Sequence, residues 1–582
     1  MKKLTLIVLI VMLRAAMAFA QPETEADEGE KTRQGIFEGF IGPTYNWVKQ
    51  DGSTRPAEYE FLKSSTGGNM HIEYAPLPHR LSIETHYLNQ KDYFGDMDYA
   101  YRDIIMLNVL TRGMYHNLDH FSFGADDPAT PSPSFTDRNP DDLYGLQNAL
   151  RRGFIRFKTP DFPFHLYAGE TTIDRAGTIQ QRFLRGFTGG LDKVSQSRDI
   201  DWNSREIRVG VNSHLGPVEV DYSRTEKKFE ARGADKVLSD VYALMTVPHD
   251  QVPDLKSGTN TVKLHTSYTG RVVGAVTYSN GDKKNLDSKA KADFRNAAGD
   301  LTVTPAAGLL LALKYRHYDL SQSNPDTVTL PGLVSPTSVR DAISSKRDVV
   351  TGAARYRVTP SLTVKGEYAF ETTERTTGLA PDDWDVAHRT TKTTEKLGIA
   401  YRVLSKLSLK ADVSAAQVEN PAYAADPDRI DEGKATVTWT PVRQVVALAS
   451  YGGVREKRND LSAPLAGGSR KSDRDQALGS LTFLAGKRSS ITASYVYLNY
   501  KTAETLTFRD AAGLFNLEHG VPYGDKAQIF SLAVSRALSD RVMVVADASK
   551  SFSRGNFRSS ETVPDTTGID SLSDLRVVED IY

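Results

Sequence analysis

The sequence predicts an all-β fold, a large transmembrane antiparallel β-barrel of about 22–26 strands with short periplasmic turns and long extracellular loops. Three observations predict it. Segments that alternate between apolar and polar residues recur along most of the chain. Short turns and long polar stretches alternate between these segments, as they do between the two ends of such a barrel. An export signal stands at the N-terminus, and no later segment reaches the roughly 18 apolar residues of a transmembrane helix.

Composition narrows the class of protein. The 582 residues include no cysteine, so this chain holds no disulfide, no thiolate metal site and no covalently attached c-type haem. The mean hydropathy of −0.41 excludes a polytopic helical membrane protein. The net charge of −1 lacks the basic excess of a dedicated nucleic-acid binder. A β-rich envelope protein or an ordinary multidomain enzyme remains.

Residues 1–20 have the layout of a bacterial secretory signal. Lys2 and Lys3 precede an apolar run over residues 4–13, and small residues occupy positions −3 and −1 before Gln21. A short amphipathic N-terminal helix is the alternative, but the run has no polar face. We therefore expect a signal peptide at 1–20, a polar periplasmic segment at 21–34 and a single barrel at 35–582, located in the bacterial cell outer membrane.

Residues 351–370 show the repeated unit of the barrel. Ala354, Tyr356 and Val358 alternate with arginines, and a second alternating segment follows a turn at residues 359–361. This period is typical of a strand with one apolar and one polar face. About eleven such turns, with flanking strands near 35–48 and 572–582, predict about 24 strands. The other turns are expected at Pro76-Leu77, Arg112-Gly113, Thr159-Pro160, Leu215-Gly216, Thr269-Gly270, Thr304-Pro305, residues 404–406, Thr440-Pro441, Gly486-Lys487 and Leu538-Ser539. Long loops are expected at 225–258, 321–346, 371–394, 417–433, 455–475 and 501–526.

The alternation assigns side chains to two faces of the wall. In a barrel the polar residues line the lumen and the apolar ones face lipid, whereas in a soluble β-sandwich or propeller the polar residues would face water. Soluble folds do not segregate loop lengths to one end, and propeller blade signatures are absent. The lumen-facing candidates are Arg208, Lys314, Arg316, Arg355, Arg357, Lys365, Glu367, Lys410 and Asp412. The lipid-facing candidates are Leu311, Leu313, Leu407, Leu409, Val437 and Trp439.

Tyrosines add a weaker signal for a membrane barrel. They number 26, against 23 phenylalanines and 4 tryptophans, and several stand near strand ends, such as Tyr315, Tyr368 and Tyr495. An amphipathic ring suits the lipid headgroup level, which predicts an interfacial girdle. Ordinary strand propensity also enriches tyrosine, so this signal alone leaves both explanations open.

The width of the barrel raises the question of what fills it. Diameter grows with strand number, and about 24 strands exceed the 16–18 of open porins, so an empty lumen would leak. Alternation begins by about Ile36, which leaves no room for an N-terminal plug domain of the kind that TonB-dependent transporters carry. We therefore expect a long loop or another protein to occupy the lumen.

Several stretches resemble the MtrB/PioB family of outer-membrane barrels. They are the repeated hairpins, the Thr-Pro turns, KYRHYDLSQSN at residues 314–324 and EYAFETTER at residues 367–375. The resemblance covers nearly all of the mature chain, through a repeated style rather than a diagnostic motif. It implies a barrel that sheathes a periplasmic multihaem c-type cytochrome in its lumen and exchanges electrons with an extracellular cytochrome or a mineral. Haem is then expected only in a partner.

The sequence departs from that family in two places. Many members carry a Cys-x-x-Cys pair near the mature N-terminus, and this chain has no cysteine. The residues that alternate back from Tyr582 are Asp580, Val578 and Arg576, which are not the apolar run of an ordinary closing strand. This predicts either a truncated C-terminus or an atypical last strand.

The expected function is a trans-outer-membrane conduit for extracellular electron transfer. The alternative is a loop-gated solute or polysaccharide channel of the outer membrane, and a structural or adhesive surface barrel is a third class. No P-loop, nucleophile elbow or HExxH motif occurs, so no enzymatic activity, catalytic residue, cofactor-binding residue or metal ligand is expected in this chain.

Two residue groups were weighed as metal ligands. His116 and His120 lie four residues apart on an alternating segment, where this spacing lacks the one-face logic of a helical zinc pair, so polar lumen side chains are the favoured interpretation. Acidic pairs such as Asp141-Asp142 and Asp382-Asp383 are expected in loops, as solvated charge or as calcium ligands.

Overall fold

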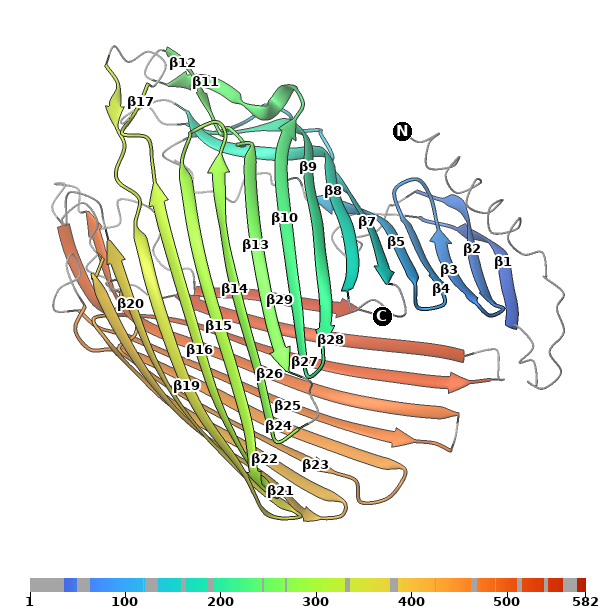
Figure 1. The fold of residues 1–582 in the computed structure, drawn as a ribbon. Coiled ribbons are helices and arrows are strands. Elements are labelled where there is room, and N and C mark those ends of the chain that lie inside the picture. Colours follow the sequence, from blue (N-terminus) through green and yellow to red (C-terminus); the bar gives the residue numbers. More distant parts are fainter. Residues whose placement is uncertain are drawn as a thin grey trace.

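The chain folds into one curved sheet of 24 antiparallel strands, which confirms the predicted barrel architecture (Figure 1). A further short strand, β6 (Ser134–Asp137), joins this sheet in parallel to β9 and makes it 25-stranded. This computed structural model describes residues 36–49, 63–118, 120, 134–158, 164–185, 192–242, 245–266, 270–329, 335–376, 386–423, 425–461, 468–486, 488–509, 515–538, 543–557 and 573–581. The expected signal peptide and polar segment lie outside these residues.

Each antiparallel strand pairs with the next one along the chain. The first twelve are β1 (Ile36–Asn46), β2 (Ser65–Ala75), β3 (His79–Tyr87), β4 (Tyr93–Tyr101), β5 (Ile105–Leu118), β7 (Tyr144–Lys158), β8 (Phe164–Arg185), β9 (Asp192–Leu215), β10 (Val218–Arg232), β13 (Leu255–Thr266), β14 (Val272–Asn285) and β15 (Lys291–Ala306). The second twelve are β16 (Leu309–Ser323), β19 (Ser344–Thr359), β20 (Leu362–Thr376), β21 (Arg389–Leu404), β22 (Leu407–Glu419), β23 (Arg429–Trp439), β24 (Val445–Arg458), β25 (Arg470–Leu484), β26 (Ser489–Arg509), β27 (Phe515–Ala537), β28 (Met543–Phe557) and β29 (Ser573–Ile581). Two small hairpins stand in the loops, β11 (Leu238–Tyr242) with β12 (Met245–His249) and β17 (Thr327–Val328) with β18 (Thr337–Ser338).

Connection lengths separate the two ends of the wall. At one end, eleven turns of two to five residues join the strands, and at the other end the connections reach 25 residues. Strand β1 starts and β29 ends at the short-turn end, which is the periplasmic end in an outer-membrane barrel. Within the described chain, β1 pairs only with β2 and β29 only with β28, so the two edge strands share no ladder.

Nine of the eleven expected turns fall at these connections. Thr304-Pro305 lies at the end of β15, just before the turn at residues 307–308, and one further expectation lay farther from a turn. The expected turn at Arg112-Gly113 lies within β5, and the turn instead connects β4 to β5 at residues 102–104. Gly113 is small for a packing reason, because a Cβ there would stand 2.3 Å from the Tyr93 ring. Glycine within a strand often marks such a close approach and not a turn.

The expected long loop at 501–526 was also wrong, because β26 and β27 continue through it. Their pairing runs out to Arg509 and Phe515, well beyond the neighbouring strands. Two paired strands in water need no apolar face, so polar composition did not distinguish this hairpin from a loop.

The wall is a single layer with almost no interior. Only ten hydrophobic side chains among the described residues are buried, and several of these, such as Leu146, Val194 and Ile200, belong to β7 and β9 near the long loops. In the part of the chain that the structure describes, no helix is long and apolar enough to cross a membrane.

Candidate functional site: the polar face of the wall and its mouth

The strand register brings all nine polar candidates onto one face of the sheet. Arg355 stands opposite Lys365, Lys365 opposite Gly398, and Gly398 opposite Asp412. The same parity carries through the intervening strands to Lys314, Arg316, Glu367, Lys410 and, across β15 to β10, to Arg208 on β9. We call this face of the sheet the polar face.

The six apolar candidates share the opposite face, here called the apolar face. Leu409 stands opposite Val437, and Leu407 opposite Trp439. Leu311 and Leu313 reach the same side through Ala354 and Gly352 on β19. Leu313 is 52% exposed and Trp439 is 49% exposed, as expected for side chains that face lipid in a membrane.

One sector of the polar face is strongly basic. Strands β16, β19, β20, β21 and β22 place eleven basic and three acidic side chains on it, and we call this sector the basic wall. The basic members are Lys314, Arg316, Arg347, Arg355, Arg357, Lys365, Arg375, Lys392, Lys396, Arg402 and Lys410, and the acidic members are Glu367, Glu371 and Asp412.

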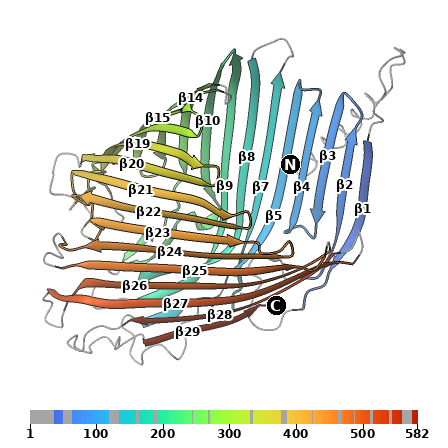
Figure 2. The same cartoon turned by 90° about the horizontal axis from the view of Figure 1, so that it is seen from below.

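A second sector is acidic and lies half the sheet away. Strands β1–β4 place five carboxylates and one arginine on the polar face, and we call this sector the acidic wall. Its charged members are Glu38, Glu73, Glu84, Asp96, Asp98 and Arg80. These strands are the first to fourth of the 24, whereas the basic wall is the thirteenth to seventeenth. The two sectors accordingly stand on opposite sides of the curved sheet (Figure 2).

A third sector of the polar face is lined by hydroxyl groups. Between β23 and β27, serine and threonine side chains pair across the strands at 3.2 Å (Thr436 with Ser450) and 3.0 Å (Thr482 with Thr492). Ser490 and Ser535 are 2.7 Å apart in the same way. These pairs satisfy each other's hydrogen bonds and add no charge to this part of the polar face.

Aromatic rings mark both borders of the apolar face. On the side of the long loops, each of four strands carries a tyrosine as its last aromatic residue before the polar residues begin. These tyrosines are 42–51% exposed: Tyr222 on β10, Tyr278 on β14, Tyr315 on β16 and Tyr451 on β24. Toward the short turns the corresponding positions carry Tyr356, Trp439 and Phe483. On β16 the apolar residues from Leu309 to Tyr315 span about 20 Å along the strand at about 3.3 Å per residue. The predicted interfacial girdle therefore corresponds to two rows of rings on one face.

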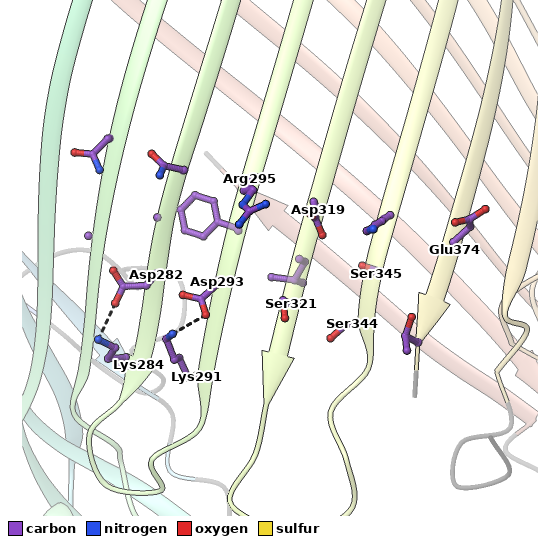
Figure 3. A pocket seen from close by; sticks show the side chains of 18 of the residues that line it. Asp282, Lys284, Lys291, Asp293, Arg295, Asp319, Ser321, Ser344, Ser345 and Glu374 are labelled. Carbon is purple, nitrogen blue, oxygen red and sulfur yellow. Dashed lines mark ion pairs between the residues drawn. The ribbon is translucent and has the colours of Figure 1, made fainter. Parts of the chain in front are cut away.

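Beyond the row of rings that lies nearer the long loops, the apolar face becomes charged. A groove of ≈ 980 Å³ crosses β13–β20 at this level, and most of its lining residues, including Arg295, Asp319 and Glu374, share the parity of Leu313 (Figure 3). Asp282 pairs with Lys284 at 3.2 Å and Asp293 with Lys291 at 2.6 Å. Charged side chains at this height belong to the headgroup and water level above a membrane.

Buried arginines hold the long loops at the mouth of the sheet. Arg198 on the polar face of β9 is 3% exposed, and its guanidinium donates to the carbonyl oxygens of Asp235 (3.0 Å), Lys236 (3.0 Å) and Asp250 (2.8 Å). These carbonyls belong to the loop between β10 and β13 that carries the β11–β12 hairpin. One side chain thereby fixes both ends of that loop against the polar face.

Arg458 repeats this arrangement at the end of β24. It is 7% exposed and donates to the carbonyl oxygens of Asp460 (3.0 Å) and Asp426 (3.0 Å), which lie in two different long loops. Sequence reasoning missed both anchors, because an arginine on the polar face has the same pattern whether it lines the wall or caps a loop.

A histidine–aspartate pair fastens the loop between β5 and β7. His120 Nε2 lies 2.6 Å from Asp137 Oδ2, and the Ser195 hydroxyl of β9 donates to Asp137 Oδ1 at 2.8 Å. The carbonyl of Asp142, 2.9 Å from His120 Nδ1, raises the pKa of His120; burial opposes this and Asp137 adds to it. Burial would raise the pKa of Asp137, but hydrogen bonds from His120, Ser195 and the Asn139 amide outweigh burial and lower it.

The residues considered as metal ligands are not brought together. Among the residues that the structure describes, no group of three or more His, Asp or Glu side chains is placed to hold a metal ion. Asp142 instead accepts a hydrogen bond from the Ser197 hydroxyl. The pair Asp382-Asp383 lies outside the described residues.

An even-numbered, single-layer antiparallel wall with an apolar belt, short turns at one end and long loops at the other defines an outer-membrane β-barrel. Solved structures agree with this class. The ferric yersiniabactin uptake receptor FyuA from Yersinia pestis matches with a TM-score of 0.50 and 10% identity, over 90% of this chain and 86% of that chain. The ferric-catecholate import receptor Fiu from E. coli K12 matches with a TM-score of 0.48 and 11% identity, over 82% of this chain and 75% of that chain.

At such low identity these likenesses show the fold alone. No protein-family model and no curated protein matches the sequence. The resemblance to the MtrB/PioB family therefore stays a prediction.

Proposed function

We propose that the chain is a loop-capped solute channel of the outer membrane, with the polar face lining the lumen and the apolar face toward lipid. The observation that carries the proposal is the solvent exposure of the charged side chains on the polar face. Seven of the nine lumen candidates, all except Arg316 and Glu367, are exposed, and charged side chains left in water need a wet or occupied lumen.

In such a channel the apolar face contacts lipid and the polar face lines the lumen. Leu311, Leu313, Leu407, Leu409, Val437 and Trp439 supply the lipid contact, and the aromatic rows set the depth of the barrel. Arg198 and Arg458 hold long loops against the mouth of the sheet, and in this proposal these loops are the gate of the channel. The wall performs no chemistry, because its contribution is shape and charge.

Planar-bilayer recording tests the channel. Purified barrel is expected to give stable currents without a partner, and releasing the loops with Arg198→Met and Arg458→Met together is expected to raise the conductance. A conservative control is Arg205→Met, since Arg205 pairs with Glu170 at 2.7 Å on the outward side of β9. Correctly folded barrel that carries no current would overturn the proposal.

A second candidate is the sheath for a multihaem c-type cytochrome, with an extracellular cytochrome as a further partner. The family resemblance and the uncovered charged polar face favour it, because a protein in the lumen would cover those charges. Purification from the native membrane discriminates the two candidates. Haem absorbance and a co-purifying cytochrome in stoichiometric amount support the sheath, and their absence from intact complex rejects it.

A further inference from the structure

The basic wall contains a like-charge pair that the fold itself does not need. Arg355 and Lys365 are directly opposite each other on neighbouring strands and point to the same face. Like charges in this position destabilise an antiparallel pair. Glu367, two residues along β20, pairs with Lys365 at 2.8 Å, and Arg355 is left without a carboxylate among the described residues. A costly pair that the wall retains points to a role for an anion from outside the chain.

Seven of the eleven cations of the basic wall have no carboxylate partner among the described residues, and three of these seven lie in neighbouring rows. Arg355, Arg357 and Lys410 are exposed, and none of them has an ion-pair partner among the described residues. Others are neutralised, as Arg347 is by Glu371 at 2.7 Å and Lys365 by Glu367 at 2.8 Å. In the row that leads from Arg357 to Lys410, only the small side chains of Thr363 and Ala400 stand between the two cations.

The basic wall is far more positive than the chain as a whole. The whole chain has a net charge of −1, yet five of its strands carry eleven basic and three acidic side chains on one face. The acidic wall has five carboxylates and one arginine and stands on the other side of the sheet. Because the basic excess is the larger, anions are concentrated more strongly than cations.

The width of the barrel decides how far this effect reaches. Twenty-four strands at about 4.8 Å each give a circumference of about 115 Å and a diameter of about 37 Å before the tilt widens it. The Debye length is about 10 Å at 0.1 M salt, so the wall attracts ions within a layer along its surface and not in the centre of the lumen. Selectivity should therefore be pronounced in dilute salt and lost near 1 M.

We propose that the channel is anion-selective, and that carboxylate- and phosphate-bearing solutes pass along Arg355, Arg357 and Lys410. This inference rests on the proposed solute channel and names its class of solute. The guanidinium groups bind a carboxylate or phosphate through paired hydrogen bonds, and exposure keeps each contact weak enough for release to the next.

Reversal potentials measured across a KCl gradient in dilute salt test the proposal. Chloride permeability is expected to exceed potassium permeability in the natural chain. The variant with Arg355→Glu, Arg357→Glu and Lys410→Glu is expected to reverse this order. Lys256→Glu changes the same charge on the outward side of β13 and is expected to leave the order unchanged. Citrate added to the bath is expected to reduce the current of the natural chain and not of the triple variant.

The outcomes separate the inference from the proposed function. Currents that prefer potassium, that show no preference, or that keep their preference in the triple variant overturn anion selectivity and leave the channel standing. Folded barrel that gives no current overturns both. Retained strand content and heat-dependent gel mobility show that the triple variant has folded.

Discussion

The hydroxyl of Tyr315 donates a 2.6 Å hydrogen bond to Asp348 Oδ1 on the neighbouring strand, across the border between the apolar band and the charged rim. Tyr451 makes the same bond to Asp475 at 2.7 Å, and Tyr222 donates to Asn260 at 3.2 Å. In each pair the acceptor lies two residues nearer the long loops than the register partner of the tyrosine. The ring stays in the apolar band while the hydroxyl is bonded to the first polar side chain above it.

Removing one of these hydroxyl groups should weaken the border locally. Tyr315→Phe is expected to lower the free energy of unfolding by about 1 kcal/mol, the usual net value of a hydrogen bond. Urea unfolding from lipid vesicles measures this loss. Tyr368→Phe is the matched control, because the Tyr368 hydroxyl has no side-chain partner in the described chain. Equal losses in the two variants would show that the bond to Asp348 contributes nothing.

The assignment of the two faces predicts opposite behaviour for adjacent residues. Leu409→Arg places a charge toward lipid at the third residue of β22, within the apolar band, and is expected to cost up to about 2–4 kcal/mol, the cost of a basic residue at the bilayer midplane. Lys410→Ala removes a charge from the polar face and is expected to leave assembly intact. Folding yield into vesicles and heat-modifiable gel mobility measure both. An assembly defect of equal size in the two variants would reverse or abolish the assignment.

The loop anchor at Arg198 predicts a local effect on the mouth. Arg198→Met leaves three carbonyl oxygens without their donor, at a cost of about 1–3 kcal/mol for each that stays buried. Hydrogen exchange in residues 234–250 is expected to accelerate while the strands remain protected. The pair of Arg205 with Glu170 is exposed to solvent and far from the loop, so Arg205→Met should not change that exchange. Unaltered protection of the loop in Arg198→Met would contradict the anchor.

The loop between β5 and β7 should be held less firmly both at low pH and at high pH than between them. The raised pKa of His120 means that its contribution is complete below the ordinary histidine pKa and is lost as pH rises through the raised value. The lowered pKa of Asp137 means that its contribution is present above the ordinary aspartate pKa and is lost as pH falls through the lowered value. Protection of residues 134–142 is expected to be greatest between these limits.

Limited proteolysis of that loop over a pH series measures the effect. His120→Gln retains hydrogen-bonding capacity without a titratable ring, so its proteolysis should no longer change on the alkaline side. A natural chain whose loop is cut at the same rate throughout that range would rule out the His120–Asp137 pair as a pH-dependent fastener.

Strand number, turn positions and the two-face pattern were predictable because each depends on residues close in the sequence. Parity alone sorts Leu409 from Lys410, and a Thr-Pro pair such as Thr440-Pro441 marks a turn without reference to the rest of the chain. Gly113 misled the prediction because its small size serves the Tyr93 ring on another strand. Arg198 and Arg458 were missed for the same kind of reason, since their partners are backbone carbonyls that only the folded loops bring near.

The position of the basic wall and the acidic wall on opposite sides of the sheet also could not be predicted from local sequence. Glu73 and Lys365 are separated by almost 300 residues, and only the strand count places them half a circumference apart. A count wrong by two strands would still preserve each wall, because neighbouring strands create it.

The near absence of buried hydrophobic side chains gives the lipid bilayer the role that a protein interior has elsewhere. The apolar band on the outward face is complete only when acyl chains cover it, so the folded protein and its surrounding lipid form one thermodynamic unit. The thickness of the host bilayer should then set the stability of the wall, much as core packing does in a soluble domain. A change of lipid would act on this molecule as a core mutation acts on others.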